Sequence, residues 1–178
     1  MTEQADSPSS ETKAAGLDRA GMPAESESWE VFLRQRLVPP CVVLAAGNRL
    51  RADDGVGVEI VERIPERCRW IALDGGMAPE NLIGPLCRLQ PKTVLLIDAA
   101  HFGAPAGTIR LFEGNELAEV DISTHSLSPK LFLEHLQRRT GAAVYLLGIQ
   151  PERCTFGEPL SRHCLEAAEV VLTFLGKC

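Results

Sequence analysis

Short, almost entirely apolar runs recur along the chain, at CVVLAA (41–46), TVLLID (93–98) and VYLLGI (144–149). A strand that is apolar on both faces is typical of a parallel sheet, because helices cover both of its sides. WIALD (70–74) predicts a fourth strand, and the alternation in TIRLFE (108–113) indicates a more exposed edge strand. Helical patterns lie between these runs. The sequence therefore predicts an α/β fold, a three-layer α/β/α sandwich with a largely parallel five-stranded sheet, in which one edge strand could be antiparallel.

Capping residues mark where the helices begin and end. Serine stabilises the first turn, proline is tolerated there, and glycine favours the position just after the last turn. These signals predict helices at 29–37 after Ser28, at 54–64, from Pro79 to about Arg88, from Pro129 to about Thr140 between Ser128 and Gly141, and from Ser161 to about Leu175.

Composition divides the chain near residue 38. Residues 1–27 hold almost no large apolar residue, so we expect 1–38 to be a disordered or weakly ordered extension and 39–178 to form one domain. Residues 1–28 hold six acidic and two basic residues, a net charge of −4 out of the chain's −6, which leaves −2 for the remainder. A nearly neutral domain without a basic stripe argues against a nucleic-acid partner.

Targeting and redox signals are sparse. We find no secretory signal and no apolar run of the roughly 20 residues that cross a bilayer, so we expect a cytoplasmic protein without a membrane partner. The six cysteines include no C-x-x-C pair, which predicts reduced thiols, several of them buried.

Unusual polar residues follow several of the predicted strands. In an open α/β sheet, ligands bind beyond the carboxyl ends of the strands. If the strands are parallel, one edge of the sheet collects Asp53, Asp54, Asp74, Asp98, His125 and Gln150. Ordinary alternatives exist: an aspartate of the first pair could cap the next helix, Asp98 could bond to nearby backbone, and His125 could be a solvated loop residue.

Asp54, Asp98 and His125 form a candidate metal-binding set. The run that ends in Asp98 is so apolar that its carboxylate should be partly desolvated, and such a group requires a partner, a proton or a cation. Two carboxylates and one imidazole suit a borderline divalent ion such as zinc, nickel or manganese. Three protein ligands would leave positions open for water or substrate, as a catalytic site requires.

Three glycines surround the adjacent aspartates. Gly47 permits an unusual turn after the strand, while Gly55 and Gly57 remove side chains at the start of the helix. Either they admit another backbone, such as a substrate's, or they let the helix pack tightly on the sheet.

Five segments, in order along the chain, resemble one enzyme family. GNRLRADDGVGVEIV (47–61) is similar to the signature G-N-x-x-x-x-D-(D/E)-x-x-G-x-x-(V/L) of the hydrogenase maturation endopeptidases. DGGMAPEN (74–81), LLIDAA (95–100), THSLS (124–128) and LLGIQP (146–151) look like further family segments. The APEN and GIQP runs are most similar to the branch that serves hydrogenase 3, the formate-hydrogenlyase hydrogenase.

The resemblance implies an activity, a partner and a set of site residues. Family members remove a C-terminal peptide from the precursor of the large subunit of a nickel–iron hydrogenase, and they are thought to recognise nickel already installed in that precursor. Asp54, Asp98 and His125 match the family's metal-contacting residues. A divalent metal that the enzyme itself holds is an alternative that the resemblance leaves open. Asp74 matches a residue linked to substrate selection, and we expect substrate contacts from Asp74, Gly75, Gly47, Asn48 and Gln150.

The mechanism implied is hydrolysis of a peptide bond by a water that the metal or a carboxylate activates. No serine or cysteine pairs recognisably with a histidine, which disfavours a covalent intermediate. The alternatives are a non-catalytic, chaperone-like binder of the same precursor, a receiver-like signalling domain, and a nucleotide-binding module. The last lacks G-x-G-x-x-G spacing, and its two aspartates would repel a phosphate.

Overall fold

The computed structural model of the chain describes residues 28–65, 68–113, 116, 121–122 and 128–177. Its elements, in order, are α1 (Trp29–Arg36), β1 (Cys41–Ala45), the 3-10 helix η1 (Ala52–Gly55), α2 (Val56–Glu62), β2 (Trp70–Asp74), the 3-10 helix η2 (Pro79–Leu82), α3 (Ile83–Leu89), β3 (Thr93–His101), β4 (Ile109–Phe112), β5 (Asp121–Ile122), α4 (Pro129–Thr140), β6 (Ala143–Ile149) and α5 (Arg162–Gly176). The predicted disorder of residues 1–27 lies outside the described residues.

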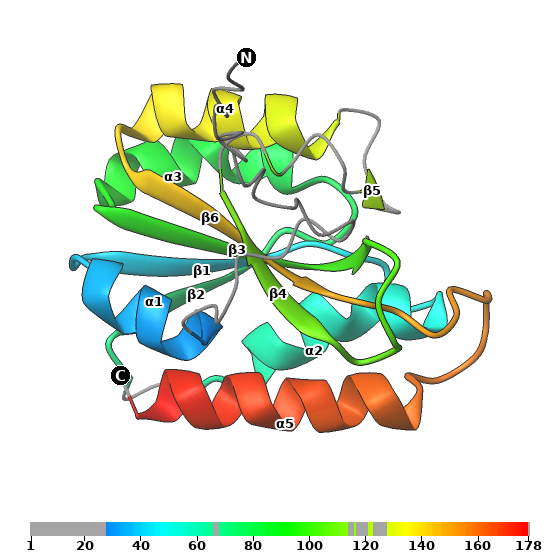
Figure 1. The fold of residues 1–178 in the computed structure, drawn as a ribbon. Helices are drawn as coiled ribbons and strands as arrows, with labels where there is room; N and C mark the ends of the chain where they lie inside the picture. The colour runs from blue at the N-terminus through cyan, green and yellow to red at the C-terminus, as the bar shows by residue number, and fades with distance from the viewer. Residues whose placement is uncertain (1–27, 66–67, 114–115, 117–120, 123–127, 178) are drawn as a thin grey trace, which may run out of the picture.

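A largely parallel sheet of five strands forms the centre of the molecule (Figure 1). The strand order is β2-β1-β3-β6-β4, in which β2, β1, β3 and β6 are parallel and β4 runs antiparallel to β6 at the edge. The predicted sheet and its antiparallel edge strand are therefore confirmed. Because four strands are parallel, their carboxyl ends lie at one edge, and the loops that follow them lie together there.

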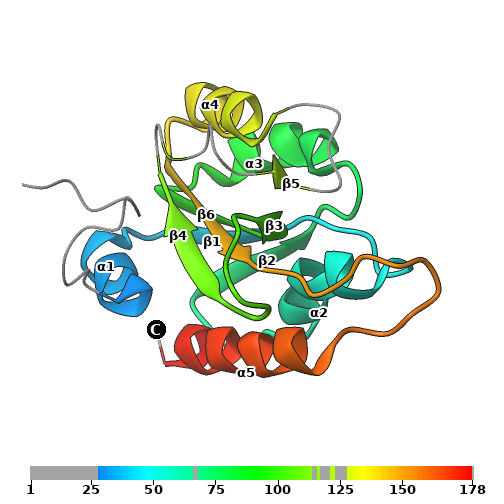
Figure 2. The same cartoon turned by 45° about the vertical axis from the view of Figure 1, so that its right-hand side comes forward.

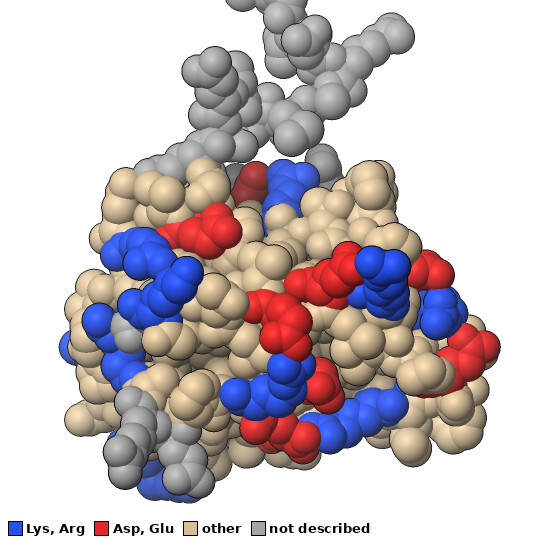
Figure 3. Space-filling model, turned by 90° about the horizontal axis from the view of Figure 1, so that it is seen from below, with Lys and Arg blue, Asp and Glu red and all other residues tan. Residues whose placement is uncertain are grey.

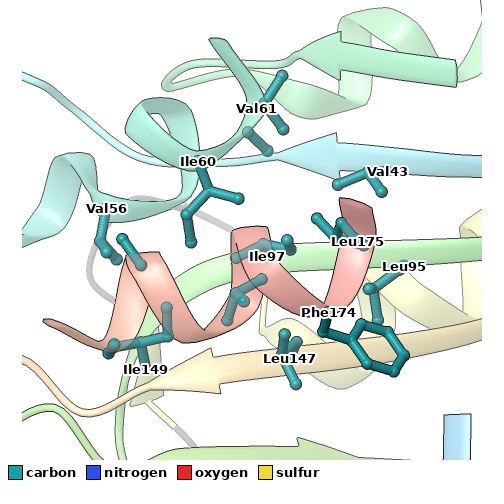
Figure 4. Packing of buried hydrophobic residues seen from close by; sticks show 14 of the residues in the cluster. Val43, Val56, Ile60, Val61, Leu95, Ile97, Leu147, Ile149, Phe174 and Leu175 are labelled. Carbon is teal, nitrogen blue, oxygen red and sulfur yellow. The ribbon is translucent and has the colours of Figure 1, made fainter. Parts of the chain in front are cut away.

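Helices cover both faces of the sheet and complete the predicted three layers. Helices α1, α2 and α5 lie on one face and α3 and α4 on the other (Figure 2). On the first face, Ile60 of α2 and Phe174 and Leu175 of α5 pack against strand residues such as Leu95 and Leu147 (Figure 4). Strands buried on both sides explain why their sequences are apolar throughout.

Strand β3 is longer than its apolar run predicts. It continues past Asp98 to His101, because Ala99 still pairs with Ile149 of β6 and Ala100 pairs with Ile122 of the antiparallel β5. Asp98 is therefore a strand residue and not a strand end. The two-residue β5 has no apolar run of its own, so it was not predicted.

The helix predicted at 54–64 begins with a tighter turn. Residues 52–55 form η1, in which the Asp54 amide donates to the carbonyl of Arg51, three residues earlier, at 3.1 Å. Ala52 has a left-handed backbone with φ of +47°, which is uncommon outside glycine, Asn and Asp. The α-helix proper then runs from Val56 to Glu62.

Charges of both signs mix on the face that α5 and α2 present to solvent (Figure 3). An ion pair between Arg63 and Glu169 joins these two helices, and Arg162 pairs with Glu166 along α5 at 2.7 Å. This face carries no extended basic patch of the kind that binds nucleic acid. Within the described residues, no helix is long and apolar enough to cross a membrane.

Candidate functional site

The chain turns sharply after β1, and glycine makes this turn possible. Gly47 adopts φ of +133°, and a Cβ there would lie only 1.9 Å from the carbonyl oxygen of Asp54. The Gly47 amide donates to the Gly76 carbonyl at 2.9 Å, which joins the loop after β1 to the loop after β2. No other residue type fits this position without moving the aspartate loop.

Asp54 is fully buried and lies over the central strands. Its carboxylate oxygen Oδ2 accepts a hydrogen bond from the Asn48 amide at 3.2 Å, and its carbonyl accepts a bond from the same amide at 3.1 Å. The turn that carries it, η1, contacts β3. The loop thus closes on itself and holds the Asp54 side chain at the carboxyl edge of the sheet.

Asp53 is also fully buried but faces a different part of the chain. Its oxygen Oδ2 accepts bonds from the amides of Glu152 (2.8 Å) and Arg153 (3.2 Å), and Oδ1 accepts one from the Ser161 amide at 2.6 Å. Burial alone would raise the pKa of the Asp53 carboxyl, but these three backbone donors outweigh it, so the pKa lies below its ordinary value. Neither η1 nor α2 has a side-chain cap, so the capping alternative for the aspartates is wrong.

Asp98 is buried in the middle of the sheet's carboxyl edge. It pairs with Gly148 of β6, and alternation along β3 places it on the same face as Leu96 and Ala100, which pack towards α3 and α4. A Cβ on Gly148 would lie 2.9 Å from Ala100 and from the Phe112 ring, so the surroundings of Asp98 are closely packed. A carboxylate in such surroundings requires a proton, a hydrogen-bond donor or a cation.

Asp74 lies at the end of β2, beside Ala45 of β1, and is exposed. Its Oδ1 accepts a bond from the Gly76 amide at 2.8 Å, which shapes the tight turn that follows. Gly75 donates to the Ala45 carbonyl at 3.0 Å, and a Cβ on Gly75 would lie 2.7 Å from that oxygen. The structure thus places the Asp74 carboxylate at the surface, at the carboxyl edge of the sheet.

Gln150 follows β6 and is almost fully buried, at 7% exposed. Its Oε1 accepts bonds from the amides of Phe102 (2.9 Å) and Ala104 (3.3 Å), and its Nε2 lies 3.5 Å from His101 Nδ1. The side chain therefore holds the loop that leaves β3. Substrate contact by Gln150 stays a prediction, since the observed contacts are within the chain.

The structure places most of the residues that the sequence singled out at one edge of the sheet. Asp54, Asp74, Asp98 and Gln150 all lie at the carboxyl edge of the four parallel strands, with Gly47, Asn48 and Gly75 in the loops between them. His125 lies outside the described residues, so its place in the set stays a prediction. Among the residues described, no three His, Cys, Asp or Glu side chains are grouped closely enough to hold a metal ion.

The glycines around the aspartates serve close packing. A Cβ on Gly57 would lie 2.3 Å from the Ile97 carbonyl oxygen and 2.7 Å from that of Ala46, and one on Gly55 would lie 2.9 Å from the Cα of Arg49. This chain's own backbone fills the space that each glycine leaves. The expectation that Gly55 and Gly57 admit a substrate backbone is therefore wrong. The alternative, close packing of the helix on the sheet, is confirmed for Gly57, whereas Gly55 packs on the loop at Asn48 and Arg49.

The partners of Asp53 were missed by the sequence reasoning. Glu152, Arg153 and Ser161 are about 100 residues away in the chain, and only backbone amides make the contact. Ser161 was recognisable as a helix cap, and its Oγ does accept a bond from the Cys164 amide at 3.2 Å. Nothing in the sequence around Ser161 indicates that the Ser161 amide donates a hydrogen bond to Asp53.

Comparison with known proteins places the chain in a family. A profile described as hydrogenase maturation protease matches residues 58–175. The Hydrogenase 3 maturation protease of Escherichia coli K12 is 32% identical over 133 residues, which cover 73% of this chain and 85% of that protein.

Solved structures agree in fold as well as in sequence. A crystal structure of a Hydrogenase 3 maturation protease superposes with a TM-score of 0.70 at 32% identity, covering 77% of this chain and 89% of that one. A nickel–iron hydrogenase maturation protease, HycI, from Thermococcus kodakarensis KOD1 gives a TM-score of 0.68 at 27% identity over 77% of this chain and 90% of its own.

The fold and its relatives define an α/β peptidase. The chain belongs to the hydrogenase maturation protease family, as its profile match and its relatives show. Similarity to the hydrogenase 3 type, which the APEN and GIQP runs predicted, is confirmed. Membership of this family sets aside the receiver-like and nucleotide-binding alternatives.

Proposed function

We propose that this protein removes a C-terminal peptide from the nickel-loaded precursor of the large subunit of a nickel–iron hydrogenase. The observation that carries the proposal is the pair of buried carboxylates, Asp54 and Asp98, at the carboxyl edge of a sheet shared with Hydrogenase 3 maturation proteases. Membership of a peptidase family supports the reaction class. The substrate follows from the resemblance and from the names of the relatives.

The nickel of the precursor is, in this proposal, part of the substrate. Asp54, Asp98 and His125 contact it, two through carboxylate oxygens and one through imidazole nitrogen, which is a set that suits nickel. Two carboxylates held in a buried position attract a cation strongly, because little water is present to compete for them. A resident divalent ion would use the same oxygens, so adding a divalent ion to the enzyme with nickel-free precursor separates the two cases.

The surrounding loops contact the polypeptide of the precursor. Asp74 is exposed at the same edge of the sheet and selects the substrate. Asn48 and Gly75 are partly exposed in the loops after β1 and β2, and the buried Gly47 shapes the first of these loops for the substrate. Gln150 would add a contact from the end of β6. The reaction takes place in the cytoplasm and involves neither nucleic acid nor membrane, as the sequence predicts.

Hydrolysis proceeds by direct attack of water on the scissile carbonyl. Binding of the substrate nickel fixes the peptide beside the aspartates. A carboxylate would take the proton of the attacking water and pass it to the leaving amine, and the nickel would assist by lowering the pKa of a water that it binds. Cys164 is the buried thiol nearest to Asp53, but burial raises its pKa to about 12, so it is neutral and unsuited to nucleophilic attack.

Intact-mass spectrometry of the purified precursor tests the proposal. We expect loss of a short C-terminal peptide when precursor carries nickel, and no loss with nickel-free precursor, even after a divalent ion is added to the enzyme alone. Asp98→Asn and His125→Ala should lower the cleavage rate at least about 100-fold. The matched control is Glu166→Gln, which neutralises an exposed carboxylate on α5 and should cleave as the unaltered protein does.

Precursor binding separates the enzyme from its main alternative. A chaperone-like binder would retain the nickel-loaded precursor on a column while its mass stays unchanged over hours. That result, obtained with precursors of each hydrogenase in the same cell, would overturn the peptidase proposal.

A further inference from the structure

The two adjacent aspartates have separate surroundings. The Asp54 carboxylate bonds within its own loop, to the Asn48 amide, whereas the Asp53 carboxylate takes three amides from the segment that joins β6 to α5. Asp53 is fully buried and is not among the metal-contacting residues that the resemblance implies.

Asp53 is also tied to that segment through its backbone. Its amide donates to the Arg153 carbonyl at 3.1 Å, so four hydrogen bonds join this single residue to residues 152–161. A fifth bond, from the Gly157 amide to the Leu50 carbonyl at 2.7 Å, joins the same two segments nearby. The turn that carries Asp54 is therefore held through Asp53, the residue directly before it, by hydrogen bonds to another segment of the chain.

We propose that Asp53 is a positioning residue that holds the Asp54 carboxylate in place for the substrate nickel. The proposal rests on the proposed function for its catalytic consequence, although the positioning itself does not depend on the reaction. Asp54 has little freedom to move. Asp53 is anchored to the β6–α5 segment on one side of it, and Gly57, three residues further on, packs closely against the Ile97 carbonyl. Small displacements at a reacting centre cost large factors in rate.

A carboxylate is required because three donors converge on it. Two oxygens with several lone pairs satisfy three amides, whereas the amide side chain of asparagine offers one acceptor oxygen and turns an NH₂ group towards a backbone donor. Asp53→Asn has nearly the same shape as the native residue but leaves at least one of the three amides without its partner.

Hydrogen exchange of single amides tests the positioning without any substrate. The Asn48 amide bonds to the carboxylate and the carbonyl of Asp54 and not to Asp53, so its exchange rate reports on how firmly Asp54 is held. We expect Asp53→Asn to speed exchange at Asn48 at least about 10-fold, in addition to exchange at Glu152, Arg153 and Ser161. Faster exchange confined to those three amides would overturn the proposal, because Asp53 would then anchor only the β6–α5 segment.

Thr93→Val is the matched control for a general loss of stability. Thr93 is fully buried at the opposite edge of the sheet, where its Oγ1 accepts a bond from the Val38 amide at 3.0 Å and donates to the Val38 carbonyl at 3.1 Å. This variant also loses buried side-chain-to-backbone bonds, but far from the site. It should leave Asn48 exchange unchanged when compared at equal free energy of unfolding.

Cleavage kinetics then connect the geometry with the reaction. At a temperature where each variant is folded, Asp53→Asn should lower kcat by about 10- to 100-fold with KM within about 3-fold, since precursor affinity is spread over many contacts. Thr93→Val should keep both constants. Equal kcat for Asp53→Asn and the unaltered protein would overturn the catalytic consequence. If the unaltered protein cleaves no precursor, the proposed function fails, and the exchange at Asn48 still decides whether Asp53 positions Asp54.

Discussion

Single buried residues in this protein differ in what their surroundings do to their chemistry. The Asp53 carboxyl gains three backbone donors, and its pKa falls even though burial opposes the charge. The Cys164 thiol donates weakly to the Gln150 carbonyl at 3.7 Å, and burial, the largest effect on it, raises its pKa to about 12. Depth of burial therefore does not decide the charge state; the supply of hydrogen-bond donors does.

Cys164 should be inert as long as the protein is folded. Its thiolate is about 1,000-fold scarcer than that of a thiol with a pKa of 9.0, and its side chain is fully buried. With iodoacetamide at about pH 8, we expect Cys87, which is partly exposed, to be alkylated first and Cys164 at least about 100-fold more slowly. Peptide mass mapping of the native protein measures both rates, and comparable rates would contradict the burial argument.

The same shift predicts how stability depends on pH. The folded pKa of Cys164 lies above the unfolded value of 9.0, so the neutral thiol's contribution to stability is complete below that pH. It is lost as pH rises from about 9 towards about 12. The difference in unfolding free energy between the unaltered protein and Cys164→Ala should thus be constant from about pH 6 to 8 and shrink above pH 9. Urea titrations at each pH measure it.

At the residue scale, sequence identifies side chains better than it identifies their partners. Asp54 was recognisable as one of two adjacent aspartates between a strand and a helix, and Asp98 as a carboxylate in an apolar run; both prove to be buried at the predicted edge. The anchoring of Asp53 was not recognisable, because backbone amides of any residue can donate and the contact spans about 100 residues. The residue type does not reveal a hydrogen bond that its backbone amide donates to a distant side chain.

At the level of elements, the sequence predicted those features that interactions between neighbouring residues determine, such as helix caps. The α4 helix has Ser128 as its cap, with Oγ accepting from the Leu131 amide at 3.3 Å, and Gly141 ends it at φ of +71°, as its sequence indicates. The extension of β3 and the tight turn η1 depend on tertiary contacts instead. Pairing with β5 prolongs the strand, and the bonds to residues 152–161 hold the turn.

At Gly57, the contacts between α2 and the sheet reverse the usual preference of a helix for alanine over glycine. In an isolated helix, Gly57→Ala would add up to about 1 kcal/mol of stability. Here a Cβ would lie 2.3 Å from the Ile97 carbonyl oxygen, beside Asp98, so the helix must move away from the sheet. We expect Gly57→Ala to lower the free energy of unfolding by about 1–3 kcal/mol and to reduce cleavage. Chemical denaturation and the precursor assay measure the two effects.

Gly176 provides the matched control for that substitution. It lies in the last turn of α5, and a Cβ there would meet no atom within 4 Å. Gly176→Ala should therefore leave stability unchanged or raise it by up to about 1 kcal/mol. A Gly57→Ala variant that gained stability as Gly176→Ala does would show that α2 is not packed on the carbonyls of Ile97 and Ala46.

For the whole molecule, the three-layer arrangement explains why α1 matters. This helix shares the face of the sheet with α2 and α5, where Leu33 is fully buried. Trp29 packs edge-on against Phe174 with ring centroids 5.0 Å apart, and Phe32 packs against Tyr145 at 6.0 Å. The three layers and the largely parallel sheet followed from the alternation of helices and strands, whereas the strand order did not. The packing of α1 did not, because nothing in a short amphipathic helix indicates which surface it covers.

Two truncations test where the folded unit begins. Removing residues 1–38 deletes α1 together with its buried aromatic contacts, so the free energy of unfolding should fall by at least about 4 kcal/mol, since a single buried leucine contributes about 2–5 kcal/mol. Removing residues 1–27 keeps α1, and the composition of that stretch predicts a change within about 0.5 kcal/mol. Urea denaturation followed by far-UV circular dichroism measures both.

If the variant that lacks residues 1–38 does not fold, Leu33→Ala replaces it. Val31→Ala, at an exposed position of the same helix, is then the control. Full stability after loss of residues 1–38 would place the start of the folded unit at about residue 39, whereas a large loss from removal of 1–27 alone would place it before α1.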